Sequence, residues 1–264
     1  MTLPNSKGLL LHGIDTLQCA YYLSSLGRSC GIDFTELRTL RETLRNRKSK
    51  DPEMITLGDT PFLLASHGTS SGYPFLLTNE DFKIECGEFN SPSFFVTFKS
   101  QALWKETAYA LHGKFLAWAA NLGFKAIRPE TLSRVDYCFD YHLPEIDFNE
   151  DSFVSRSTKD SQHRENGKVQ TFTLGRGDIV LRIYDKVAEI AEQSDKVWFF
   201  ELWKQDQDVW RIEWQVRKPI LKQFGIAAFD SLRQSHGDLL RYLAEEHTTL
   251  RSRTEKGTTS RSNT

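Results

Sequence analysis

The stretch RVDYCFD, residues 134–140, alternates charged or sulfur-bearing side chains with large apolar ones. In a β-strand, side chains at positions i, i+2 and i+4 point to the same face of the sheet. One face of this strand would therefore carry Arg134, Asp136, Cys138 and Asp140. The opposite face would carry Val135, Tyr137 and Phe139. The pattern predicts a strand with one face toward a core and the other available for chemistry.

Two further stretches show the same alternation, LRIYDK at residues 181–186 and WRIEWQV at residues 210–216. In the first, the shared face carries Arg182, Tyr184 and Lys186. In the second, it carries Arg211, Glu213 and Gln215. If the three strands are neighbours, one face of the sheet holds three carboxylates, a tyrosine and several cations. Such a set suits metal-assisted attack on a phosphodiester.

Hydrophobic periodicity and turn residues outline the other elements. Strands are expected over residues 13–22, in a meander over 54–99, and in a hairpin over 169–186 that turns at GRGD. Helices are expected over residues 32–46, 101–122, 187–193, 220–224 and 229–244, the first capped by Asp33 or Thr35. Within the polar stretch 142–168, the segment SRSTKDSQHRENGK, residues 155–168, is expected to be a mobile loop. The order predicts an α+β fold with a curved, mainly antiparallel sheet and helices packed on one face.

The length of 264 residues suits one large domain or two small ones. We expect a single catalytic domain over residues 1–246, which could consist of two similar halves, 9–125 and 126–246. A disordered basic tail is expected over residues 247–264, from composition. The four cysteines form no CxxC pair, and no apolar run is long enough to span a membrane. These features predict a cytoplasmic protein with free thiols and no membrane partner.

The three carboxylates allow two interpretations. Asp136, Asp140 and Glu213 together would form an oxygen-rich site, and hard cations such as Mg²⁺ or Mn²⁺ prefer such ligands. Alternatively, the acids pair with arginines on a solvated sheet face, namely with Arg134, Arg182 and Arg211. Spacing alone leaves both open.

Tyr184 is the candidate nucleophile of this face. A phenol has an ordinary pKa of about 10, so it needs neighbouring cations or a base to attack near neutral pH. Arg182 and Lys186 flank Tyr184 on its own face and would supply that field. A tyrosine that only packs in the sheet is the competing interpretation.

DNA contact would depend on local patches, because the formal net charge is −1. Residues 37–50 carry six basic residues and one acid, and they could contact a DNA backbone or form a solvated helix face. Arg176, in the GRGD turn, could hold a phosphate. The candidate DNA-binding residues are Arg38, Arg41, Arg45, Arg134, Arg176, Arg211 and Arg217.

The chain resembles the Rep_trans group of plasmid, phage and transposon rolling-circle replication initiators, which includes some conjugative relaxases. The resemblance covers about residues 13–225 through four motifs in order. They are G-x-D-x-L at 13–17, R-x-D-x-x-x-D at 134–140, a Gly-Arg turn followed by Y-[DE]-K at 184–186, and R-x-E at 211–213. The short GRGD turn departs from the group, whose hairpin often has a serine after the arginine. No separate origin-recognition domain is evident.

The resemblance implies metal-dependent nicking and rejoining of DNA at an origin. Tyr184 would form a 5′-phosphotyrosyl link, assisted by Arg182, Lys186 and a Mg²⁺ or Mn²⁺ ion held by Asp136, Asp140 and Glu213. The implied partners are single-stranded or hairpin origin DNA, a host helicase and a replicative polymerase, and the group allows a homodimer. A conjugative relaxase with the same chemistry and a non-catalytic DNA-binding protein remain alternatives.

Overall fold

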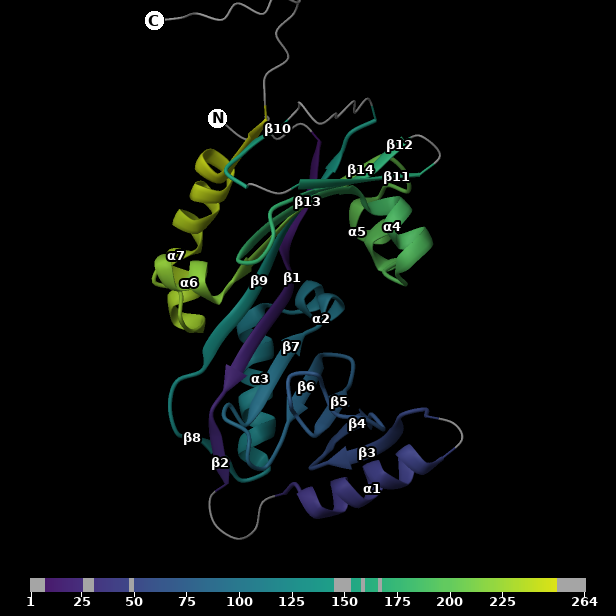
Figure 1. The fold of residues 1–264 in the computed structure, drawn as a ribbon, viewed down its shortest axis with the longest axis vertical. Coiled ribbons are helices and arrows are strands. Elements are labelled where there is room, and N and C mark those ends of the chain that lie inside the picture. Colours follow the sequence, from purple (N-terminus) through teal and green to yellow (C-terminus); the bar gives the residue numbers. More distant parts are fainter. Residues whose placement is uncertain are drawn as a thin grey trace, which may run out of the picture.

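A computed structural model describes residues 8–25, 31–47, 50–144, 153–157, 160–165 and 168–250 (Figure 1). Its main feature is one open sheet of eleven strands in the order β11-β12-β13-β14-β9-β1-β7-β6-β5-β4-β3, with every recorded pairing antiparallel. The predicted fold class, α+β with a large antiparallel sheet, is confirmed.

The longest strands lie in the middle of this sheet, where β1 (Leu9–Tyr21) pairs with β9 (Thr131–His142). On one side follow β7 (Phe94–Phe98), β6 (Phe82–Cys86), β5 (Phe75–Thr78), β4 (Thr60–Leu64) and β3 (Glu53–Leu57). On the other side follow β14 (Val209–Arg217), β13 (Ile179–Asp185), β12 (Lys168–Leu174) and β11 (Asp160–Glu165). Two small pairs are separate: β2 (Leu23–Ser25) with β8 (Phe124–Ala126), and β10 (Phe153–Ser155) with β15 (Thr248–Leu250).

Seven α-helices surround the sheet in the described part of the chain (Figure 1). They are α1 (Phe34–Asn46), α2 (Ser100–Lys105), α3 (Ala108–Asn121), α4 (Lys186–Gln193), α5 (Trp198–Trp203), α6 (Lys218–Gln223) and α7 (Phe229–Tyr242). A π-helical turn, Leu243–His247, follows α7. No helix in the described ranges is both long and apolar enough to cross a membrane.

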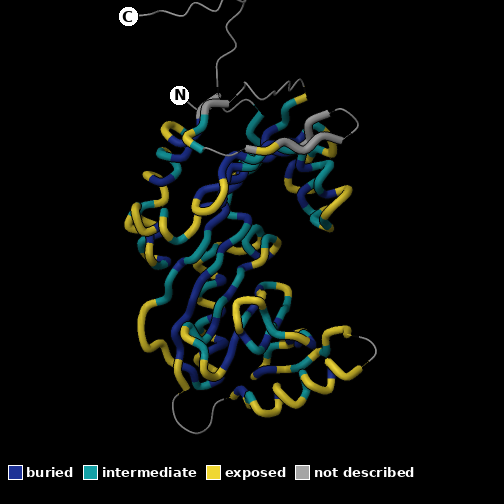
Figure 2. The backbone as a smooth tube through the Cα atoms, in the orientation of Figure 1, coloured by how far each residue is buried: buried dark blue, intermediate teal, exposed yellow. Residues whose placement is uncertain are grey.

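The core lies along the apolar face of the sheet, where successive strands contribute every second residue. Phe94, Val96 and Phe98 of β7 and Phe115 of α3 have no solvent exposure. Phe229 of α7 packs on Phe98 in the same cluster, with ring centroids 5.8 Å apart. This cluster runs from Leu17 to Leu243 and so includes residues of both proposed halves (Figure 2). One core cluster therefore includes residues of both halves, and a second, smaller cluster is formed by Ile190, Phe199, Trp203 and Val209. The similarity of the halves stays a prediction.

Three local expectations differ from the structure. The helix expected over residues 101–122 is two helices, because Thr107 adopts an extended conformation and caps α3 by accepting a hydrogen bond from the Ala110 amide at 3.1 Å. The expected loop 155–168 contains the end of β10, all of β11 and the first residue of β12, and its residues 158–159 and 166–167 lie outside the described residues. Of the expected tail, residues 247–250 are structured, and residues 251–264 lie outside the described residues.

Candidate active site

The three patterned strands lie side by side, with β14 between β13 and β9. In register, Tyr184 pairs with Arg211 and Arg211 with Asp140. One pleat along, Arg182 pairs with Glu213, and in the next Gln215 pairs with Asp136. The alternation in the sequence therefore placed these side chains on one common face, as predicted.

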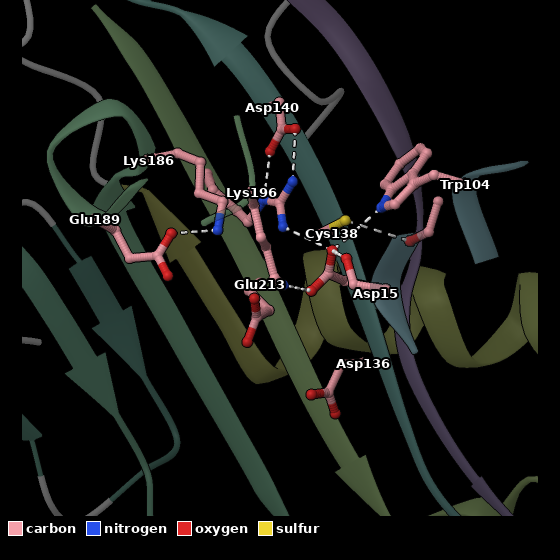
Figure 3. A network of polar contacts seen from close by, with 12 residues as sticks. Asp15, Trp104, Asp136, Cys138, Asp140, Lys186, Glu189, Lys196 and Glu213 are labelled. Carbon is pink, nitrogen blue, oxygen red and sulfur yellow. Dashed lines mark hydrogen bonds and ion pairs between the residues drawn. The ribbon is translucent and has the colours of Figure 1, made fainter. Parts of the chain in front are cut away.

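A buried ion cluster occupies the middle of this face (Figure 3). Arg211 donates from Nε to Asp140 Oδ1 at 2.6 Å, from Nη2 to Asp140 Oδ2 at 2.8 Å, and from Nη1 to Asp15 Oδ1 at 3.0 Å. The side chains of Arg211 and Asp140 have no solvent exposure. Arg211 was a candidate DNA contact, and that expectation is wrong for the described structure because no ligand can reach its guanidinium.

Asp15 of β1 connects α2 and the loop before α5 to the cluster. Its Oδ1 accepts from Ser100 Oγ at 2.7 Å and from Trp104 Nε1 at 3.1 Å, both on α2, and its Oδ2 accepts from Lys196 Nζ at 2.9 Å. Burial alone would raise the pKa of Asp15, but Arg211 and Lys196 outweigh burial and lower that pKa well below its ordinary value. Sequence reasoning gave Asp15 no role, although it lies in the G-x-D-x-L motif. A β-bulge between Ile14 and Thr16 helps to bring it to this face.

The helix α5 covers the cluster and was not expected from the sequence. Trp203 donates from Nε1 to Asp140 Oδ2 at 2.8 Å. The ring centroid of Phe199 lies 4.4 Å from Cζ of Arg211 and 5.5 Å from Nζ of Lys186. Aromatic faces attract cations, so these contacts help to retain two buried positive charges.

Tyr184 lies next to the cluster and is 9% exposed. Its hydroxyl donates to Glu213 Oε2 at 2.9 Å. Burial, and then the negative charge of Glu213, raise the pKa of Tyr184 well above its ordinary value, whereas Arg211 acts in the opposite direction. The phenol is therefore protonated at rest and already holds a hydrogen bond to a carboxylate that could take the proton.

Lys186 follows Tyr184 at the first position of α4, which begins there because Asp185 accepts from the Ala188 amide at 3.0 Å. The ammonium of Lys186 pairs with Glu189 and lies 5.6 Å from the Tyr184 ring centroid. Its side chain is 1% exposed. Burial, and then Arg211, lower the pKa of Lys186. A cavity of about 220 Å³ lies beside it, lined in part by Arg182, Tyr184 and Glu189.

The three predicted metal ligands each pair with an arginine, which is the alternative that the sequence left open. Asp136 pairs with Arg134, Glu213 with Arg182 at 3.2 Å, and Asp140 with Arg211. Among the described residues, no group of three or more histidines, cysteines or acids is arranged to hold a metal. The face is also largely buried rather than solvated, since Asp136 and Glu213 are 1% and 9% exposed.

The pairs differ in their access to solvent. Arg134 and Arg182 are 23% and 34% exposed, so each could leave its carboxylate when a ligand arrives. Asp136 and Glu213 are diagonal neighbours on the face, and Mg²⁺ is often held by one or two carboxylates together with substrate phosphates. These two acids therefore fit such an ion. Asp140 does not fit, because both its oxygens are taken by Arg211 and Trp203.

Burial, together with the charge of Glu213, raises the pKa of Asp136 to about 6, although Arg134 acts in the opposite direction. Arg217 at the end of β14 is in register with Arg134, and its amide donates to the carbonyl of Asp178 in the turn that holds Arg176. Arg134, Arg176 and Arg217 thus lie at the same end of the sheet. The other candidates, Arg38, Arg41 and Arg45, lie on α1.

Comparison with known proteins gives a likeness in fold. No model of a known protein family matches the chain, and no curated protein matches it. Among solved structures, the chain resembles a rolling circle replication initiator protein from Geobacillus stearothermophilus, with a TM-score of 0.54 and 17% sequence identity. The likeness covers 96% of this chain and 90% of that one. The two proteins share a fold over almost their whole length.

Proposed function

We propose that the protein is a rolling-circle replication initiator that nicks and rejoins DNA through Tyr184. The observation that carries this proposal is the hydrogen bond from the Tyr184 hydroxyl to Glu213, on a face that also holds Arg182 and Lys186. The fold shared with the Geobacillus initiator supports it, because the likeness spans the strands that form this face.

In the proposed reaction, the Tyr184 oxygen attacks the phosphorus of the scissile phosphodiester while Glu213 Oε2 takes the phenol proton. A bond forms between the tyrosine oxygen and phosphorus, and the bond to the 3′ oxygen breaks. The 3′ oxygen takes a proton from water, which leaves a free 3′-OH and a 5′-phosphotyrosyl link. Attack by a 3′-OH on that link reverses the step and returns the proton to Tyr184, so rejoining needs no nucleotide.

The cations of the face would stabilise the charge of the pentacoordinate phosphate. Protonation of Glu213 weakens its pairing with Arg182, which then becomes free to bind a phosphate oxygen. Lys186 would add charge from the buried side. A divalent ion, Mg²⁺ or Mn²⁺, would be held by Asp136 and Glu213, and when bound it would polarise the scissile phosphate.

The proposed substrate is single-stranded or hairpin DNA of an origin. Arg134, Arg176 and Arg217 would hold its backbone at the end of β13 and β14 away from Tyr184, where Arg176 and Arg217 are exposed. A role in replication would bring in a host helicase and polymerase in the cytoplasm, and the family resemblance allows a homodimer. These partners are part of the proposal.

The test is incubation of the protein with Mn²⁺ and a labelled single-stranded oligonucleotide pool, followed by a denaturing gel. We expect a covalent protein–DNA adduct that is absent in Tyr184→Phe and retained in Tyr22→Phe, a tyrosine remote from the site. Cleavage without an adduct would show a water-using nuclease. An adduct that persists in Tyr184→Phe would exclude Tyr184 as the nucleophile.

A further inference from the structure

The helix α1 lies at one end of the long axis of the molecule, and the β13–α4 region lies toward the other end (Figure 1). The helix α1 packs on the sheet through Leu37 and Leu44, which are 5% and 0% exposed. Arg41 ties α1 to the β5 region, since its Nη1 donates to the carbonyl of Pro74 at 2.6 Å and its Cζ lies 5.4 Å from the Phe75 ring centroid. Arg41 therefore positions the helix and does not face a ligand.

The outer face of α1 is a continuous exposed stripe (Figure 2). The exposed residues of α1 recur at the helical spacing of three and four, and they are Thr35, Glu36, Arg38, Thr39, Glu42, Thr43, Arg45 and Asn46. Arginine, asparagine, threonine and glutamate are side chains that form hydrogen bonds with base edges in the major groove of DNA. The surrounding segment 37–50 has six basic residues against one acid, which complements a polyanion.

Little holds the basic side chains of this stripe in place. Arg38 approaches Glu88 at 3.7 Å, but the two side chains are 44% and 45% exposed, so the pair is weak. In the described structure, no hydrogen bond or ion pair is recorded for Arg45. The helix itself is firmly started by Asp33, whose Oδ1 accepts from the amides of Thr35 and Glu36 at 2.9 and 3.0 Å. A capped helix thus presents exposed polar side chains.

We propose that α1 is the element that recognises the origin, by lying in the major groove of duplex DNA and reading bases through Arg38, Arg45 and Asn46. The inference rests on the proposed replication function and names where its site selection is located. Thirteen residues make a helix of about 20 Å, and the major groove of B-DNA admits one helix.

The sheet topology sets the distance between the two sites. Eight strand spacings separate β3, at the edge near α1, from β13. At about 4.8 Å each they span about 40 Å across the strands, close to one turn of B-DNA. The pairing of β7 with Leu17–Tyr21 of β1, whereas Asp140 in the Tyr184 row pairs with Leu11, adds an offset along the strands. The duplex read by α1 would therefore lie one helical turn or more from the phosphodiester that is cut.

The experiment is selection of bound molecules from a randomised pool of 30-base-pair duplexes, followed by sequencing. We expect the wild-type protein to enrich a sequence motif. Arg45→Ala and Asn46→Ala should each bind the enriched duplex at least about tenfold more weakly than the wild-type protein. Their loss of affinity for unselected duplex should be smaller. Arg241→Ala, which removes an exposed arginine from α7, is the matched control and should keep the motif. Circular dichroism and thermal unfolding would show that each variant is folded.

Three outcomes would overturn the proposal. In the first, the wild-type protein enriches no motif. In the second, both α1 variants enrich the same motif with unchanged affinity. In the third, the substitutions weaken binding to all duplexes equally. The last result would mean that α1 touches phosphates alone. Failure of the proposed nicking function is distinguishable, because it would appear as the absence of a Tyr184 adduct whatever the pool selects.

Discussion

Arg211 and Asp140 lie in the sheet without solvent contact, and each satisfies the charge of the other. Without Asp140, the carboxylate of Asp15 alone would face the positive charges of Arg211 and Lys196, so one positive charge of the cluster would be uncompensated. We expect Asp140→Asn to lower the free energy of unfolding by about 3–5 kcal/mol in urea denaturation. Asp238→Asn removes an acid from an exposed pair with Arg241 and should cost less than about 1 kcal/mol. Equal losses in the two variants would contradict the account of the buried pair.

The raised pKa of Asp136 makes a second prediction at the residue scale. Between pH 4 and about 6 the folded carboxyl keeps a proton that the unfolded chain has lost, so this group reduces stability as pH rises through that range. We expect the unfolding free energy of the wild-type protein, relative to Asp136→Asn, to fall by roughly 2–3 kcal/mol from pH 4 to 7, measured with chelator present. A difference in unfolding free energy between the two proteins that does not change with pH would contradict the raised pKa of Asp136.

Metal binding should also depend on the protonation of Asp136, since its ionised carboxylate is a proposed ligand. Affinity for Mn²⁺, measured by calorimetry, should increase as pH rises through about 6 and should be lost or strongly reduced in Asp136→Asn. Gln193→Ala is a control beside the cavity that carries no charge. Unchanged affinity in Asp136→Asn would remove Asp136 from the proposed ligands.

At the scale of elements, α5 offers a matched pair of substitutions. Trp203 donates to Asp140, whereas the indole nitrogen of Trp198 is buried with no hydrogen-bond partner in the described structure. Trp203→Phe should therefore cost about 1.5–3 kcal/mol, the range for a hydrogen bond to a charged group. Trp198→Phe should be neutral or stabilising, because it removes an unsatisfied donor. Thermal and urea unfolding of both variants would check the difference, and the opposite order would contradict it.

The elements also show where sequence reasoning succeeds. Alternation predicted the three strands of the site and their shared face, because side-chain direction in a strand depends on sequence spacing alone. The helix α5 was missed because WFFELW is apolar almost throughout and shows no single period. The break at Thr107 was missed because an apolar stripe continues across it, while one hydroxyl cap decides the boundary.

At the scale of the whole molecule, the eleven-stranded sheet explains what the sequence could not predict. Alternation assigns Arg211 to a face, but only the packing of α5 and α2 over that face decides that its guanidinium is buried. The same packing separates Asp140 from Asp136 and Glu213, whose arginine partners are partly exposed. The role of Asp15 depends on a bulge and on partners from three distant segments. Burial of charge is a tertiary property, so a local pattern could not reveal it.

The most direct test of the proposed function is mass spectrometry of the covalent adduct after digestion with trypsin. Cleavage after Arg182 and Lys186 would release the tetrapeptide IYDK, residues 183–186. If Tyr184 is the nucleophile, the nucleotide is attached to this peptide through Tyr184. A nucleotide on the peptide of residues 135–156, which contains Tyr137 and Tyr141, or no modified peptide from an active protein, would contradict it.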